Sequence, residues 1–271
     1  MASSFREALD EAVAYYTEHG YGSAERLSDW MRRLYAVARQ DSPSDEVLQS
    51  RMQKAMRTYL QRATSYSVTR RRHPGVPRYT IQQIAPRLRP ELDRRIRASA
   101  DLIKLNRGQA IDKTLQRFSG WATSVPAGGS RVVDKREVKQ DLSKALRQLS
   151  YEERRVAIDQ GHKLMASVDA VIAEQSGAIA AIWRSHWRQP GYDYRPDHKE
   201  RDQKIFAIRG NWAMEKGLVG KGDGYLDEMT QPAEEPFCRC YVVYLYNLRD
   251  LPADMLTAKG RVELERTRIR A

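Results

Sequence analysis

The chain has 271 residues, 41% of them hydrophobic and 30% charged, and a formal net charge of +12. That length can bury a sizeable core without disulfides or a metal, and two cysteines are too few for a disulfide framework. The longest apolar runs, 178–183 and 241–246, fall far short of the roughly 20 residues that a membrane helix needs, and the N-terminus has no apolar signal core. We therefore expect a soluble, non-secreted protein with no membrane partner.

Residues 1–63 are predicted to form three helices. Ser4 and Glu7 have the spacing of a capping box, and apolar residues then recur every three or four positions until Gly20 ends the pattern. A second helical pattern stops before Pro43, and a third covers about 48–63.

Prolines interrupt the helical pattern between residues 73 and 90 and rule out one continuous helix there. This segment is therefore predicted to be a basic linker or extended arm, which we place at about 67–90. Helical periodicity resumes over 92–118 and breaks again at 126–130, where a proline and two glycines lie close together.

Two further helices are predicted from capping pairs at their N-termini. Asp134 with Glu137, and Ser150 with Glu153, each combine an N-cap residue with a glutamate three positions later. Apolar residues at helical spacing follow each pair, so the chain is predicted to be helical as far as about residue 175.

The C-terminal third has the pattern of short strands and turns. Three β-rich stretches, 179–187, 204–208 and 241–245, are separated by segments that contain proline and several glycines. The predicted fold class is therefore α+β. A helical N-terminal body with the basic arm covers 1–175, and a small α+β module with a C-terminal tail covers 176–271.

The positive charge is concentrated in one segment. Between Arg51 and Arg107 there are fifteen basic residues and three acidic ones, so the rest of the chain sums to zero. A solvated helical face is the ordinary explanation of a charge run, but three consecutive arginines beside a proline-rich segment also indicate a partner rich in phosphate or carboxylate. We expect sequence-independent binding to double-stranded DNA that is lost at high salt. The arginines predicted to take part are Arg70, Arg71, Arg72, Arg78, Arg87, Arg89, Arg94, Arg95 and Arg97.

Cys238 and Cys240 form the sharpest local motif. In an extended segment, residues two apart project to the same face, so the two sulfurs point together and Arg239 points away. Two such thiols supply half of a tetrahedral zinc site, with His198 as the natural third ligand. The alternative is a pair of small buried hydrophobes and an exposed loop histidine. The predicted metal ligands are Cys238, Cys240, His198 and one of three candidate aspartates, Asp193, Asp197 or Asp202, of which we include Asp202.

Two segments of the C-terminal third carry a recognisable pattern. Residues 193–206 read DYRPDHKERDQKIF, and residues 236–240 read PFCRC. The first resembles the motif D-x-R-T-x-x-x-H-x-x-L-D-G-K-x-F of the phage Mu F-like head morphogenesis (minor capsid) family, in which the histidine is sometimes a cysteine. The second is similar to the proline, short turn and N-C-R-C that close that family's domain. A long helix and a tryptophan-containing stretch precede them, so the resemblance covers about 150–245.

The chain departs from the family pattern at three positions. Gln203 stands where the family usually has glycine, so its turn is expected to form without the freedom of a positive φ. Arg201 replaces an apolar residue, and Phe237 replaces the asparagine before the first cysteine. The proline pattern is also one residue tighter than the family's commonest form. These differences concern loop geometry rather than membership.

The resemblance implies a minor head protein of a tailed bacteriophage. Such a protein lies in the virion head near the portal vertex, and in the host cytoplasm during assembly, and it supports head assembly, DNA packaging or genome ejection. Its implied partners are the portal protein, the major capsid or a scaffolding protein, and DNA. In this family histidine and cysteine replace each other at the motif position, as they do among metal ligands, because either side chain can bind zinc. We therefore expect a structural Zn²⁺ that contributes on the order of 10–16 kcal/mol to folding.

An enzyme is the main alternative. A catalytic zinc ion would need a bound water and a base, for which Glu200 or Glu235 is available, and the activity would be that of a zinc-dependent nucleic-acid enzyme such as a nuclease. The sequence has no H-E-x-x-H, deaminase, Walker or G-x-S-x-G motif, so we expect a protein without enzymatic activity. A DNA-binding regulator is a third alternative, and no helix-turn-helix signature supports it.

Overall fold

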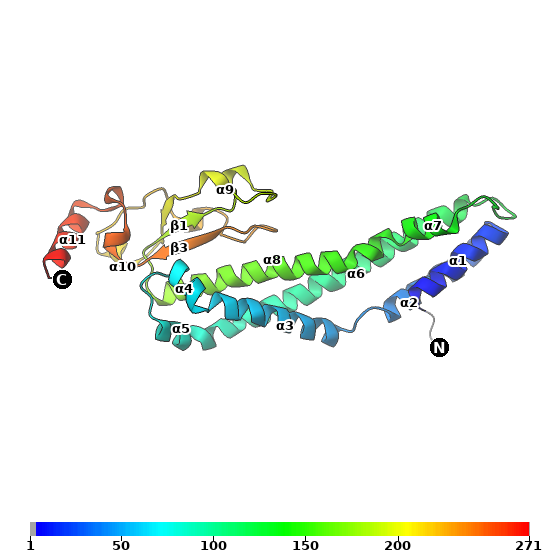
Figure 1. The fold of residues 1–271 in the computed structure, drawn as a ribbon, viewed down its shortest axis with the longest axis horizontal. Helices are drawn as coiled ribbons and strands as arrows, with labels where there is room; N and C mark the ends of the chain where they lie inside the picture. The colour runs from blue at the N-terminus through cyan, green and yellow to red at the C-terminus, as the bar shows by residue number, and fades with distance from the viewer. Residues whose placement is uncertain (1–3, 271) are drawn as a thin grey trace. The chain divides into compact units, whose positions relative to one another are not determined.

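The computed structural model describes residues 4–270 (Figure 1). Most of them are helical, and three short strands form one antiparallel sheet. The helices are Phe5–His19 (α1), Ala24–Gln40 (α2), Asp45–Ala63 (α3), Tyr66–Arg72 (α4), Arg78–Ile84 (α5), Arg89–Ser124 (α6), Lys135–Leu142 (α7), Lys144–Gln175 (α8), Pro196–Glu200 (α9), Trp212–Glu215 (α10) and Ala258–Arg270 (α11). The strands are Ala180–Arg184 (β1), Ile205–Ala207 (β2) and Tyr241–Leu245 (β3), and the 3-10 turns are Ala85–Leu88 (η1), Leu226–Glu228 (η2), Leu248–Asp250 (η3) and Ala253–Met255 (η4). None of the helices in this range is both long enough and apolar enough to span a membrane.

Several helix boundaries lie at the predicted capping and breaking residues. The Ser4 hydroxyl accepts from the Glu7 backbone N–H, and the Glu7 carboxylate accepts from the Ser4 N–H, which confirms the capping box of α1. Asp134 caps α7 by accepting from two backbone N–H groups of its first turn. The breaks expected at Pro43 and at 126–130 also separate helices.

The helix start predicted at Ser150 is wrong, because this residue lies inside α8. The helix begins after Ser143, whose carbonyl accepts from the Arg147 N–H at 3.0 Å. The intervening residues 145–149, ALRQL, have high helix propensity, so nothing delays the helix until Ser150. A capping pair within a run of strong helix formers marks no boundary.

The segment predicted to be an extended arm is folded. It forms α4, α5 and η1, and Ile81 and Leu88 are buried in a cluster with Leu164 of α8. The prolines lie at the starts of elements, where a missing N–H costs little: Pro77 precedes α5, and Pro90 lies in the first turn of α6. The prolines therefore separate short helices without leaving the chain unpacked.

The described chain packs into two compact units, each built from two stretches of sequence. The first unit contains residues up to 52 together with 97–156, and the second contains 53–96 together with 157 onward. The helices α6 and α8 each contribute to both units. The boundary expected near 175 marks a change of secondary structure, because α8 ends at Gln175 and β1 begins at Ala180, whereas packing divides the chain elsewhere.

The first unit has a helical core formed by α1, α2, α7 and the C-terminal part of α6. Tyr16 and Phe118 are fully buried in it and their rings meet edge to face. The 126–130 loop covers the C-terminal end of α1, where the Gly128 N–H donates to the His19 carbonyl at 3.0 Å. This bond satisfies a carbonyl that has no partner within the helix.

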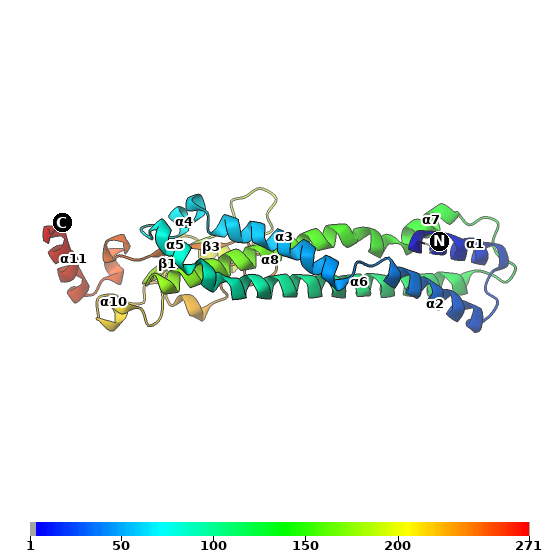
Figure 2. The same cartoon turned by 90° about the horizontal axis from the view of Figure 1, so that it is seen from below.

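The second unit contains the sheet, whose strand order is β2–β1–β3 with both pairs antiparallel. The three strands lie within the three predicted β-rich stretches. One buried cluster includes Ile179 and Leu245, and another joins Trp183 and Phe206 to the two cysteines. A third joins α3, α4, α5 and η1 to the C-terminal half of α8, beside which Figure 2 shows α4 and α5. The helix α4 also contacts β3.

Candidate metal centre

His198, Cys238 and Cys240 meet in the second unit, although forty residues separate the histidine from the first cysteine. His198 lies in the middle of the short helix α9, and the two cysteines immediately precede β3. The Nδ1 atom of His198 lies 3.5 Å from the Sγ atom of each cysteine, and all three side chains are buried. As predicted, the two sulfurs face the same imidazole.

The donor set fits a tetrahedral Zn²⁺. Zinc–ligand distances of about 2.3 Å to sulfur and about 2.0–2.1 Å to nitrogen place the two donors roughly 3.5 Å apart at the tetrahedral angle. Both Nδ1–Sγ distances have this value. Thiolate and imidazole donors also favour zinc over magnesium or calcium. The three residues could therefore hold a metal ion, and their chemistry favours Zn²⁺.

The second ring nitrogen of His198 faces a carboxylate. Its Nε2 lies 2.9 Å from Oε2 of Glu235, without the alignment of a hydrogen bond, and the same oxygen lies 2.9 Å from Nε of Arg195. Metal-binding histidines commonly direct their other ring nitrogen to a carboxylate, which fixes the tautomer and orients the ring. In the sequence Glu235 stands out only as a candidate base, because its place three residues before Cys238 says nothing about the imidazole.

The fourth predicted ligand, Asp202, lies outside this group. Its carboxylate accepts from the Ser185 backbone N–H and from the Trp187 indole N–H, both at 2.9 Å, so it holds the chain after β1. Another candidate, Asp197, forms an ion pair with Arg201 at 2.5 Å. Among the described residues, the side chains close enough to share one metal ion are His198, Cys238 and Cys240.

Contacts with α8 and with Arg195 fix the backbone just before the cysteines. Phe237 has a left-handed φ of 60°, and its N–H donates at 2.6 Å to the carboxylate of Asp159, a buried residue of α8. The Pro236 carbonyl accepts from Arg195 at 3.0 Å. Asparagine, the residue of the resembling family at position 237, adopts a left-handed φ more readily than phenylalanine.

Gln203 adopts a left-handed φ of 69°, so the expectation of a turn without positive φ is wrong. Its N–H donates to the Trp183 carbonyl at 2.9 Å, and the Lys204 N–H donates to the Arg201 carbonyl at 3.0 Å. The first bond attaches the turn to β1 and the second closes the turn, and together they hold the backbone in a conformation that a glutamine disfavours.

The two thiols of the centre differ in proton affinity. A hydrogen bond from the Cys240 thiol lowers the pKa of Cys238 to about 6, and His198 adds a smaller lowering effect. The same hydrogen bond, together with burial, raises the pKa of Cys240. One thiolate is therefore available near neutral pH, and binding of a metal cation would release the second proton.

The predicted polyanion-binding arginines differ in how far they are already paired. Arg72 is buried and forms an ion pair with Asp169 of α8, so it is a packing contact rather than a surface one. Arg95 is half-buried and donates to Gln160 and Ser167 at 3.3 Å. The exposed arginines with a carboxylate or amide partner are Arg87, Arg89 and Arg94, and those without one among residues 4–270 are Arg70, Arg71, Arg78 and Arg97.

Comparisons of this chain with protein-family models, with curated proteins and with solved structures give no match. The features on which a function can rest are therefore the His–Cys–Cys group, the two segments that form it, and the exposed arginines.

Proposed function

We propose that this chain is a minor head protein of a tailed bacteriophage, related to the Mu F-like head morphogenesis family, that acts at the portal vertex in head assembly, DNA packaging or genome ejection. The observation that carries the proposal is the meeting of the two motif segments. His198 of segment 193–206 and both cysteines of segment 236–240 surround one point. One donor set assembled from two segments that are distant in sequence lets a single ion join them.

In this proposal the centre holds Zn²⁺ through His198, Cys238 and Cys240, and its role is structural. The ion would join α9 to the chain before β3, in a part of the fold whose strands have only three to five residues. A structural zinc ion contributes on the order of 10–16 kcal/mol, which is enough to order such short elements.

Zinc content and thermal stability test the structural role. Purified protein is expected to carry about one zinc per chain by elemental mass spectrometry, and Cys238→Ser is expected to lose the metal and to unfold at a lower Tm. Asp202→Ala is the matched control. It removes two hydrogen bonds worth about 1 kcal/mol each but no ligand, so it should lower Tm and keep the metal. A metal-free wild type, or equal Tm values for wild type and Cys238→Ser, contradicts the structural role.

Co-expression with the portal protein of the same phage tests the place of action. We expect a stoichiometric complex by size-exclusion chromatography with light scattering. Separate elution of the two proteins at low salt would remove the portal assignment, whatever the metal content proves to be.

The unpaired exposed arginines support DNA as a further partner. Each phosphate contact that an arginine neutralises adds about −0.9 to the slope of log affinity against log salt. Arg70→Gln with Arg78→Gln is therefore expected to make the slope shallower by roughly two units if both contact phosphate, and equally for unrelated duplexes. Fluorescence anisotropy over a salt series measures this. Affinity that is independent of salt would exclude the DNA contact.

A zinc-dependent nuclease is the second candidate, and the ligand count favours it. Three protein ligands leave one tetrahedral position for water, as in catalytic zinc sites. This candidate predicts metal-dependent DNA cleavage that His198→Ala abolishes while the circular dichroism spectrum is retained. The structural role predicts no cleavage by the wild type.

A further inference from the structure

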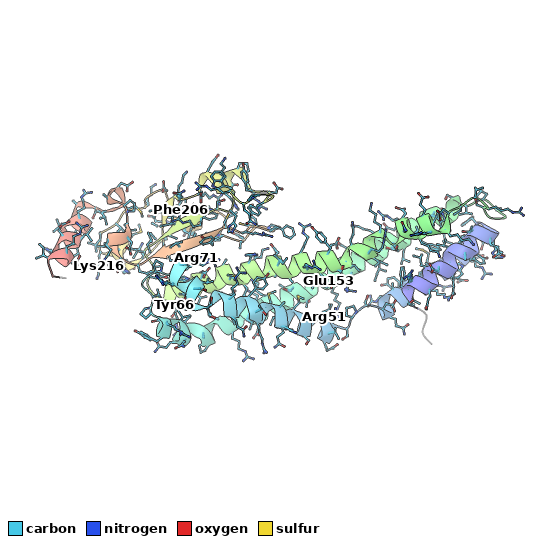
Figure 3. All side chains as sticks on the ribbon, viewed as in Figure 1. Arg51, Tyr66, Arg71, Glu153, Phe206 and Lys216 are labelled. Carbon is cyan, nitrogen blue, oxygen red and sulfur yellow. The ribbon has the colours of Figure 1, made fainter. Side chains whose placement is uncertain are left out.

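The second unit contains a cavity of about 590 Å³ with a strongly basic lining. The lining comes from α3, α4, α6, α8, β3, the chain after β1 and the chain before β3, and Figure 3 labels one of its residues, Arg71 of α4. Six arginine and lysine side chains contribute to it, against two carboxylates. The cations are Arg62, Arg71, Arg72, Arg95, Lys163 and Arg239, and the acids are Asp169 and Glu234.

Three of the six cations are already engaged within the protein. Arg72 pairs with Asp169, and Lys163 pairs with Asp159 at 3.1 Å. Arg95 donates to neutral side chains of α8. Asp169 pairs with Arg72 and also lies 3.3 Å from the ring of His73. This carboxylate therefore does not neutralise the other arginines of the cavity.

The remaining three cations have no carboxylate within 4.0 Å among residues 4–270. They are Arg62, Arg71 and Arg239. The guanidinium of Arg71 lies 5.8 Å from the centre of the Tyr241 ring, and that of Arg239 lies 5.9 Å from the centre of the Tyr192 ring. Aromatic contacts of this kind orient a guanidinium without neutralising it.

The positive potential of the cavity acts on the histidines in its wall. The pKa of His162 is lowered to about 4, first by burial and then by Arg239 and Arg62. The pKa of His186 is lowered by burial and by Arg239. Both rings are therefore neutral at pH 7 and add no further positive charge. The Glu234 carboxylate accepts from the Gln231 backbone N–H at 2.6 Å and has no basic side chain within 4.0 Å in the described chain, so one acid stands against three unpaired arginines.

The size and the other walls of the cavity indicate a small ligand with an apolar part. Its volume lies within the range of about 300–1,000 Å³ that is typical of small-molecule sites. Tyr241, Tyr244, Met165 and Val242 provide aromatic and aliphatic surface beside the guanidinium groups. The planar fork of a guanidinium matches the oxygen geometry of a phosphate and binds it through two hydrogen bonds.

We infer that this cavity binds a phosphate-bearing ligand of nucleotide size, with Arg62, Arg71 and Arg239 as its charged contacts. The phosphate could belong to a free nucleotide or to the end of a nucleic-acid strand, and both sources present the same group. The inference does not rest on a role in a phage head, because it depends only on the cavity and its charges.

Isothermal titration calorimetry on the full, metal-loaded chain at constant ionic strength tests the inference. The probes are inorganic phosphate, AMP, adenosine, and a short single-stranded oligonucleotide with and without a 5′-phosphate. AMP is expected to bind at least about tenfold more tightly than adenosine, because the charged hydrogen bonds go to the phosphate. Preference for the phosphorylated over the unphosphorylated oligonucleotide assigns the site to strand ends, and binding of AMP alone assigns it to free nucleotides.

A pair of double variants locates the binding. Arg62→Gln with Arg71→Gln removes two unpaired cations of the cavity and is expected to weaken AMP binding at least about tenfold. Lys54→Gln with Arg57→Gln removes the same charge from exposed positions of α3, outside the cavity lining, and is expected to change the affinity by no more than about twofold. Equal losses in the two double variants, equal binding of AMP and adenosine, or no binding of any phosphate probe would overturn the inference.

The ring signals of His162 give a second readout that needs no variant. They are expected to shift on addition of AMP to the wild type, and not on addition of adenosine. Unchanged His162 signals in a sample saturated with AMP would place the ligand elsewhere and overturn the inference, even if the Arg62→Gln, Arg71→Gln protein fails to fold.

Discussion

Two residues in the segments that carry His198 and the cysteines hold backbone conformations that their side chains disfavour. Gln203 and Phe237 have φ values of 69° and 60°, in the left-handed region that costs about 1–2 kcal/mol for a residue with a Cβ. Their backbone N–H groups donate to the Trp183 carbonyl and to the Asp159 carboxylate. The strained positions therefore lie in the two segments that bring His198 and the cysteines together.

Replacing Gln203 by glycine is expected to stabilise the protein. The exposed Gln203 side chain has no hydrogen bond within the described chain, so Gln203→Gly removes the left-handed penalty and loses only unfolded-state entropy, for a net gain of about 0.5–1 kcal/mol. Urea unfolding measures the change. Gln189→Gly is the control. This exposed glutamine has no positive φ, so glycine relieves no strain there and should lower the stability of the protein by increasing the entropy of the unfolded chain. A loss of stability in both variants contradicts the prediction.

His162 is expected to make stability depend on pH between about 6.5 and 4. Burial and the nearby arginines lower its folded-state pKa to about 4 from an ordinary value of 6.5. The unfolded chain therefore binds this proton more tightly, so the contribution is complete above about pH 6.5 and is lost as pH falls towards about 4. His162→Gln should remove that part of the pH dependence. Unfolding midpoints at several pH values test it, and identical pH profiles for the two proteins would refute it.

Among the helices, α8 contacts both the loop that carries the two cysteines and the C-terminal end of α4. Asp159 holds the chain before the cysteines, and Asp169 accepts from Arg72 and faces His73 of the α4 end. The His73 ring in turn lies 2.7 Å from the Tyr246 hydroxyl. One helix thus ties α4 and the end of β3 to the loop that carries both thiols.

At Gly161, the ring of Tyr59 from α3 packs directly against the backbone of α8. A Cβ added there would lie 2.3 Å from the ring of Tyr59, so the ring would have to move. Gly161→Ala is therefore expected to destabilise the protein by about 1–3 kcal/mol, although alanine is the better helix former. Gly108→Ala is the matched control in α6, where an added Cβ meets nothing within 4 Å, and it should stabilise by up to about 1 kcal/mol. Equal effects of the two substitutions in chemical denaturation would contradict this packing.

At the scale of the whole molecule, the chain passes three times between its two compact units, at 52/53, 96/97 and 156/157. The second unit needs 53–96 as well as 157 onward, because α4 and α5 pack with α8 and Arg72 pairs with Asp169. A boundary in secondary structure near 175 is therefore no boundary in packing.

A fragment of residues 176–271 is expected not to fold like the same residues in the full chain. It lacks Asp159, Asp169 and the buried Ala173, which contact the cysteine loop, α4 and the sheet cluster. Its amide spectrum should show poor dispersion even with zinc present, and limited proteolysis should cut within 193–245. Sharp, dispersed signals that overlay those of the full chain would show that the module is independent of α8.

The sequence alone was enough for the features that depend on neighbouring residues. Capping at Ser4 and Asp134, the break at 126–130 and the three β-rich stretches follow from local hydrogen bonding and periodicity, and these rules act within a few positions. The common side of Cys238 and Cys240 also follows from strand geometry. The meeting of the two cysteines with His198 was predicted from the chemistry of zinc ligands and from the resemblance to a family motif.

Only the tertiary structure decided which distant groups satisfy one another. Arg72 looked like a surface cation, but its partner Asp169 lies 97 positions away, and no local pattern connects them. In the same way, the Asp202 carboxylate accepts hydrogen bonds from a backbone N–H and an indole N–H instead of joining the cysteines. Glu235 faces the imidazole of His198, and the hydrogen bond to β1 holds Gln203 at a left-handed φ. A polar or strained residue adopts the state that its three-dimensional partners stabilise, and those partners are brought together by burial of the core.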